Sequence, residues 1–183
     1  EDGYNPTDPE PGFDMRPVTV LTDGGGVVSP TGAMVKKDGS GTPVTFMVTP
    51  NNGKKIKDVV VESGADGVTV DKTKLLTNGT FTVIGKAGGT STAAVLRVTF
   101  DDGSSTITPP PSHTVTIKPS PGGVTVPSGT VEVPDGEKLP IVIIPDPGHE
   151  VDKVWGTDEN GNRVEIPTHK DENGDIIVEV GPY

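Results

Sequence analysis

The sequence contains no cysteine, which excludes a disulfide framework, a thiol nucleophile and a zinc–thiolate site. Aromatic residues are scarce at 4% of the chain, so a sugar-binding platform built from several rings would have few residues to use. No apolar run reaches the roughly 18 residues that a membrane-spanning helix needs, and no signal peptide is recognisable. If the protein is exported, we expect its signal and its anchor to lie elsewhere in a longer chain.

Basic residues are also few, because 15 Lys and Arg stand against 26 Asp and Glu, for a formal net charge of −11. Nucleic-acid binding needs clustered Lys and Arg on phosphates, so we expect no nucleic-acid partner. The same balance disfavours an anionic membrane surface, and we expect no membrane insertion of this segment. With 25 Gly and 19 Pro, helices have little room. Only residues 71–78, DKTKLLTN, could form a helical turn, and a loop between strands is the alternative.

An internal repeat is the strongest feature that is present. Residues 38–61, DGSGTPVTFMVTPNNGKKIKDVVV, are echoed at residues 135–156, DGEKLPIVIIPDPGHEVDKVWG. The offset between counterparts is 97 residues at Gly25 and Gly122, and it falls to 95 by Pro50. Repetition on this scale predicts tandem modules.

The two-residue change in offset preserves the two faces of the strands. Side chains alternate between faces along a strand, so an even slip keeps the apolar face inward and an odd slip would invert it. Phe46 and Val48 therefore keep their parity with Ile141 and Ile143. Chance matches would not respect that rule, which supports a true duplication.

The repeat and the composition together predict an all-β chain of two small tandem modules, β-grasp-like or sandwich-like, with little or no helix. Residues 1–16 are expected to form an extended tail, because they are rich in Pro, Asp and Glu. Module one should span residues 17–102 and module two residues 113–183. Residues 103–112, with three consecutive prolines, should form a semi-rigid linker that holds the modules end to end and apart.

The second module is expected to lack the last strand of the first. Residues 93–100, AAVLRVTF, have the alternating pattern of a closing strand and have no counterpart up to Tyr183. A sheet without its neighbouring strand presents unpaired N–H and C=O groups. We therefore expect a loop or a neighbouring protein to cap that edge.

The order of these motifs is similar to that of a known family. GGVVSPTG, a following DG, an alternating strand that ends in PNNG, and then IKDVVV resemble the divergent internalin-type B-repeat family, also called bacterial repeat domains. The resemblance covers the chain from about Arg16 onward. It implies a small β-rich module of secreted or wall-attached bacterial proteins, with adhesive or spacer roles.

No motif predicts a catalytic site, a metal site or a cofactor. Residues 158–162, DENGN, and 171–175, DENGD, look like calcium loops, but the glycine and glutamate that an EF-hand requires are missing and Asn-Gly favours a hairpin tip. His113, His149 and His169 lie far apart in sequence without a zinc spacing, and surface positions are the simpler interpretation.

Trp155 is the single candidate for a ligand contact. Val154 corresponds to Val59, which is expected to point inward, so Trp155 should point outward as Val60 does. An outward tryptophan can stack on a sugar or anchor a protein. The favoured interpretation is nevertheless that the second face of the sheet is covered and that Trp155 is an ordinary core ring.

These features predict a non-catalytic spacer or adhesive segment of an exported bacterial cell-surface protein, extracellular or associated with the cell wall. The alternative is a carbohydrate-binding accessory module that uses Trp155. The expected partners are an unidentified surface protein or glycan and the neighbouring modules of the same chain.

Overall fold

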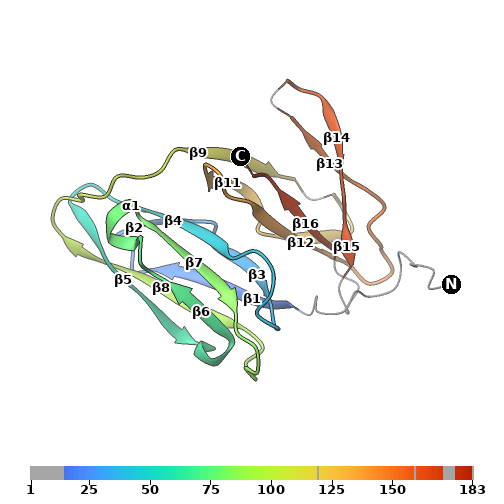
Figure 1. The fold of residues 1–183 in the computed structure, drawn as a ribbon. Helices are drawn as coiled ribbons and strands as arrows, with labels where there is room; N and C mark the ends of the chain where they lie inside the picture. The colour runs from blue at the N-terminus through green and yellow to red at the C-terminus, as the bar shows by residue number, and fades with distance from the viewer. Residues whose placement is uncertain (1–14, 119, 159, 171–175, 183) are drawn as a thin grey trace.

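A computed structural model describes residues 15–118, 120–158, 160–170 and 176–182 of this chain (Figure 1). The described part is almost entirely β-structure, so the all-β prediction is confirmed. Its helices are the four-residue α1 (Leu75–Asn78), which falls in the predicted 71–78 turn, and a three-residue 3₁₀ turn at Ala65–Gly67. Neither helix has the length or the apolar character to cross a membrane.

The N-terminal sandwich consists of two four-stranded sheets, in the orders β3-β1-β8-β5 and β2-β4-β7-β6. Its eight strands are β1 (Met15–Thr22), β2 (Gly26–Ser29), β3 (Gly32–Lys36), β4 (Val44–Pro50), β5 (Lys54–Ser63), β6 (Val68–Asp71), β7 (Thr80–Gly85) and β8 (Ala94–Asp102). Alternate side chains of both sheets meet in one core, in which Phe46 stacks on Phe81 with ring centroids 5.0 Å apart.

The first and last strands of this sandwich lie side by side. β1 pairs with β8 in parallel, from Val18 opposite Ala94 to Thr22 opposite Val98. β8 also pairs with β5 in antiparallel orientation, so it lies inside its sheet with a neighbour on each edge. β1 begins at Met15, and the tail predicted for residues 1–16 is therefore wrong for Met15 and Arg16, while residues 1–14 lie outside the described part.

The C-terminal unit repeats much of the strand plan with smaller sheets. Its strands are β9 (Ser112–Ile117), β10 (Gly123–Val126), β11 (Gly129–Pro134), β12 (Leu139–Pro145), β13 (Val154–Thr157), β14 (Arg163–Ile166), β15 (His169–Lys170) and β16 (Ile176–Val180). Among the described residues they form one four-stranded sheet, β10-β12-β16-β15, and two separate pairs, β11-β9 and β13-β14. In Figure 1 the β13–β14 hairpin projects from the rest of the unit.

The two units pack against each other, so the prediction of modules held apart is wrong. Met15 of β1 and Val142 and Ile177 of the C-terminal unit are buried in one shared cluster, with Met34 and Ile144 packed against it. β12 is thus buried on both faces, because Ile141 points into its own core and Val142 points toward the N-terminal sandwich. This explains why residues 139–145 are apolar at nearly every position instead of at alternate ones.

The segment between the units is docked and not free. β8 ends at Asp102 and β9 begins at Ser112, close to the linker bounds predicted from the prolines. Ile107 packs against the core of the N-terminal sandwich, and the Thr108 amide donates a hydrogen bond of 2.9 Å to the Thr77 carbonyl. These contacts fasten the middle of the segment to the sandwich.

Candidate binding groove

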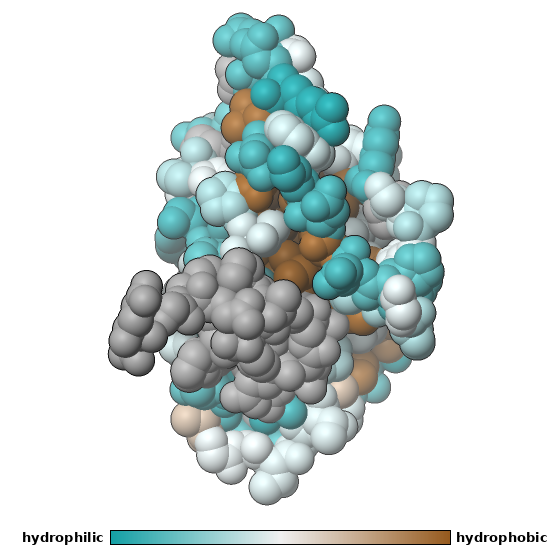
Figure 2. All heavy atoms as spheres, turned by 90° about the vertical axis from the view of Figure 1, so that its right-hand side faces the viewer, coloured by the Kyte–Doolittle hydropathy of each residue, from teal (hydrophilic) through white to brown (hydrophobic). Residues whose placement is uncertain are grey.

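A groove of about 1030 Å³ opens in the C-terminal unit, between β9 on one side and the β13–β14 hairpin on the other. Strands β12 and β16 contribute its floor. Nine aliphatic residues contribute to the lining: Val115, Ile117, Ile141, Ile143, Val154, Val164, Ile166, Val178 and Val180. Figure 2 shows that hydrophobic side chains reach the surface between hydrophilic ones on the side from which the hairpin projects.

The burial of counterpart residues shows what distinguishes this groove from the N-terminal sandwich. Val18 and Val20 of β1 are 1% and 2% exposed, and the 97-residue offset carries them to Val115 and Ile117 of β9. Both counterparts are only half-buried. In the N-terminal sandwich the place beside β1 is taken by β8, and in the C-terminal unit the place beside β9 is the groove.

Trp155 lies on β13 and lines this groove with 43% of its surface exposed. Val60, its counterpart at the 95-residue offset, is also 43% exposed, as strict alternation along the strand predicts. The favoured interpretation of Trp155 as a covered core ring is therefore wrong. The face of the sheet on which it lies carries no covering layer among the described residues that would bury it.

Two cationic side chains lie over the indole ring of Trp155. The guanidinium carbon of Arg163 lies 4.2 Å from the ring centroid, and the Lys153 ammonium lies 5.9 Å from it. Both distances are within the range of cation–π attraction. Arg163 comes from β14, where it pairs with Thr157, so the hairpin itself orients the ring.

The acidic loop at the hairpin tip is a turn, as predicted. The carbonyl of Asp158 accepts a hydrogen bond from the Gly161 amide, and its side-chain Oδ1 accepts from the amides of Asn160 (3.0 Å) and Asn162 (2.8 Å). The carboxylate is thus used to close the turn. The second acidic segment, residues 171–175, lies outside the described residues.

The described residues contain no group of three or more His, Asp or Glu side chains placed to hold a metal ion. His113 lies at the start of β9, where its Nε2 is 2.8 Å from an Asp135 carboxylate oxygen. His149 and His169 lie on other segments and join no such group. The groove therefore offers an apolar floor, an exposed tryptophan and strand edges.

No protein family, curated protein or solved structure matches this chain. The resemblance to the internalin-type B-repeat family therefore stays a prediction. What the groove does has to be argued from its own geometry and from its counterpart in the N-terminal sandwich.

Sequence reasoning missed Arg16, which it assigned to the tail. Its side chain is 1% exposed and donates hydrogen bonds to three backbone carbonyls: Nη1 to Gly67 (2.6 Å), Nε to Ser91 (2.7 Å) and Nη2 to Gly89 (3.2 Å). A Cβ on Gly67 or Gly89 would collide with the guanidinium or with neighbouring backbone, so glycine is required at both positions. The pattern of strand 15–22 alone gave no signal for this role.

The loop that Arg16 holds is fastened a second time by Asp66. The Ser91 hydroxyl and the Thr90 amide donate hydrogen bonds to the Asp66 carboxylate, and together they lower its pKa to about 2. Residues 86–93, which join β7 to β8, are thereby positioned from both sides. The connection is what delivers β8 to its place beside β1.

Proposed function

We propose that this chain is a non-catalytic, load-bearing spacer segment of an exported bacterial cell-surface protein. The observation that carries the proposal is the parallel pairing of β1 with β8, the first and last strands of the N-terminal sandwich. A spacer transmits tension along its chain, so the way in which its terminal strands are joined decides how it responds to force.

Parallel terminal strands place their outer ends at opposite ends of the sheet. Tension applied at the start of β1 and at the end of β8 therefore pulls the two strands along each other. All the hydrogen bonds from Val18–Ala94 to Thr22–Val98 carry the load together, instead of opening one after another. Resistance to forced unfolding depends on the unfolding rate, which this arrangement lowers.

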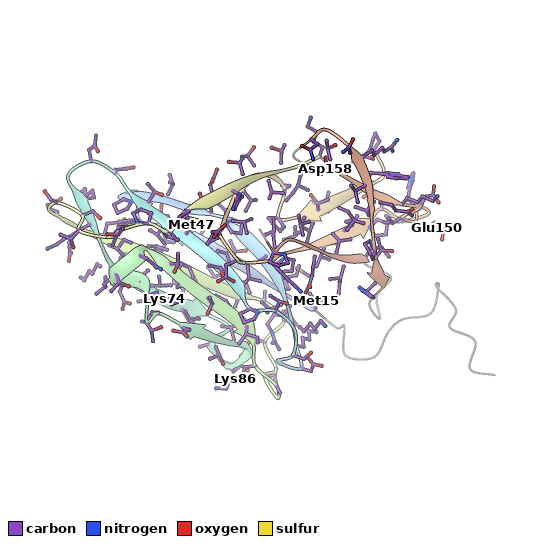
Figure 3. The ribbon with its side chains drawn as sticks, turned by 45° about the horizontal axis from the view of Figure 1, so that its top comes forward. Met15, Met47, Lys74, Lys86, Glu150 and Asp158 are labelled. Carbon is purple, nitrogen blue, oxygen red and sulfur yellow. The ribbon has the colours of Figure 1, made fainter. Side chains whose placement is uncertain are left out.

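The junction between the two units also favours a spacer. Figure 3 shows Met15 where the N-terminal sandwich meets the C-terminal unit. Two hydrogen bonds also join the units: the Glu132 amide donates one of 3.1 Å to Ser29 Oγ, and Thr42 Oγ1 donates one of 3.0 Å to Glu179 Oε1. Apolar contact combined with these bonds opposes relative motion of the units, which loosely joined domains would show.

Force spectroscopy with two pairs of anchors tests the proposal. Because the chain has no cysteine, introduced thiols give unique attachment points. Pro17→Cys with Asp102→Cys loads β1 and β8 along each other, whereas Leu21→Cys with Arg97→Cys, which lie opposite each other, pulls the two strands apart across their hydrogen bonds. Pro17, Leu21 and Asp102 are exposed, and the Arg97 side chain is 36% exposed. We expect a clearly higher unfolding force for the first pair, and equal forces for the two pairs would remove the support for a load-bearing role.

A carbohydrate-binding accessory module is the second candidate, and the exposure of Trp155 favours it. A sugar ring stacks on a free aromatic face, and Arg163 at 4.2 Å already occupies one face of this ring. The test is a glycan array read with the parent chain and with Trp155→Ala. Binding by the parent that the variant loses supports this candidate, and an array without signal from the parent removes it.

A further inference from the structure

The two edges of β9 differ. β1, its counterpart, pairs with β3 on one edge and with β8 on the other. β9 pairs with β11 and with no other strand that the structure describes. The edge of β9 that corresponds to the β8 side of β1 lines the groove, and from Val115 to Ile117 no described strand other than β11 pairs with β9.

The strand that fills the equivalent place in the N-terminal sandwich shows what fits there. β8, AVLRVTFDD, buries Ala94, Leu96, Val98 and Phe100 between the sheets, while the residues between them are turned to the other face. In the C-terminal unit the apolar side chains that would meet such residues are already in position. Val115 and Ile117 occupy the places of Val18 and Val20, which pair with Ala94 and Leu96.

We propose that the groove binds an extended polypeptide strand of the β8 type, with apolar residues at alternate positions. The strand adds in parallel to the open edge of β9 and inserts its apolar side chains over Ile141 and Ile143. A polypeptide is the occupant because it alone offers backbone partners at the spacing of a strand edge, together with side chains for the apolar floor. The hydroxyl groups of a glycan would not match the regular spacing of the N–H and C=O groups along β9. They would also lie against the aliphatic floor of the groove.

Filling the groove would join the C-terminal unit into a closed sandwich. The separate pairs β11-β9 and β13-β14 lie on either side of the groove, as β1 and β5 lie on either side of β8. The inference concerns a binding site and does not depend on the mechanical role proposed above. Either one can fail without the other.

The test uses the intact chain and a synthetic peptide with the β8 sequence AVLRVTFDD. Its matched control carries aspartate at the positions of Leu96 and Val98, which keeps the length and the backbone and interrupts the apolar face at its centre. Trp155 is the only tryptophan of the chain and lines the groove, so its emission reports occupancy without a label. We expect the β8 peptide to shift that emission to the blue in a saturable way and the control peptide to leave it unchanged.

Amide hydrogen exchange locates the bound peptide. We expect exchange in β9 to slow by at least about tenfold with the β8 peptide, and exchange in β1 to stay the same because β1 already has both neighbours. The variant Ile117→Asp should lose binding, and Val124→Asp, on the exposed face of β10, should retain it. If Ile117→Asp fails to fold, the comparison of the two peptides on the parent chain still decides.

Three results would overturn the proposal. The first is the absence of any peptide effect on Trp155 or β9. The second is an equal effect of the control peptide, which would indicate non-specific adsorption to the apolar surface. The third is a peptide-free chain that is dimeric by light scattering with β9 already protected, because the occupant would then be a second copy.

Discussion

The N-terminal sandwich and the C-terminal unit share much of one strand plan, but β8 has no counterpart among the described strands of the C-terminal unit. With β8 present, four strands form a single sheet, and Val18 and Val20 are almost completely buried. Without its counterpart, the same positions belong to separate two-stranded pairs, and Val115 and Ile117 are half-buried around a groove. An inner strand therefore does two things: it joins its neighbours and it seals the core beneath them.

The largest effect is expected from weakening β8 itself. Leu96 is fully buried, so Leu96→Ala leaves a cavity in the sandwich and should lower the free energy of unfolding by about 2–5 kcal/mol. Urea denaturation followed by circular dichroism measures this loss. Leu21→Ala, at a position 40% exposed, is the control and should cost less than about 0.5 kcal/mol. Similar losses for the two variants would mean that β8 does not seal the core.

Arg16 and His113 are counterparts at the 97-residue offset and offer the next comparison. Arg16→Lys removes the planar fork that serves three carbonyls in a buried place, and should cost about 2–3 kcal/mol. The contact between His113 and Asp135 lies at the surface, so His113→Ala should cost less than about 1 kcal/mol. The measurement is the same urea denaturation. If Arg16→Lys leaves the free energy of unfolding unchanged, the loop does not need the guanidinium of Arg16.

A smaller and sharper effect is expected from Val20→Ala and Ile117→Ala. The second variant deletes more atoms, yet it should cost less, because Ile117 borders a groove and Val20 lies in a closed core. We expect about 2 kcal/mol for Val20→Ala and at most about 1 kcal/mol for Ile117→Ala. If the larger deletion is also the more costly one, the groove is closed in solution.

Much of the fold was predictable because the repeat carries strand parity. Phe46 and Ile141, matched by the 95-residue offset, are both buried in their own cores. The lack of a counterpart to residues 93–100 predicted an incomplete sheet, and the groove beside β9 lies at that position. Alternation along the strand also predicted that Trp155 points outward. The interpretation of Trp155 as a core ring was wrong because it set this alternation aside.

The rest depends on contacts that a local pattern does not encode. The offset of 97 carries Ala33 and Val35 to Thr130 and Glu132, but Val131 and Val133 are the buried residues of β11. The pairing of β11 is shifted by one residue, because Val131 lies opposite Val115 where the offset would place Thr130, and Gly129 at the start of β11 has a φ of +76°. The second buried face of β12 likewise arises from packing between the units, which residues distant in sequence create.

The smallest predicted effect is a pH dependence that the N-terminal sandwich should show and the C-terminal unit should not. At the 95-residue offset the counterpart of Asp66 is Gly161, so the C-terminal unit has no equivalent carboxylate to titrate. The pKa of Asp66 falls from 3.8 to about 2 because Ser91 and Thr90 donate to its ionised form. A pKa that is lower in the folded state stabilises the fold above the unfolded value, and that contribution is lost as the pH falls toward 2.

Nuclear magnetic resonance follows the protonation of Asp66 through the Thr90 amide, which donates to Asp66 Oδ2. We expect its chemical shift to titrate with a midpoint near 2 in the parent chain. In Asp66→Asn the shift should be flat over that range, and the 86–93 loop should already show the faster exchange that the parent reaches only in acid. A midpoint at or above 3.8 would mean that the carboxylate is not held by these donors, and that Arg16 alone positions the connection to β8.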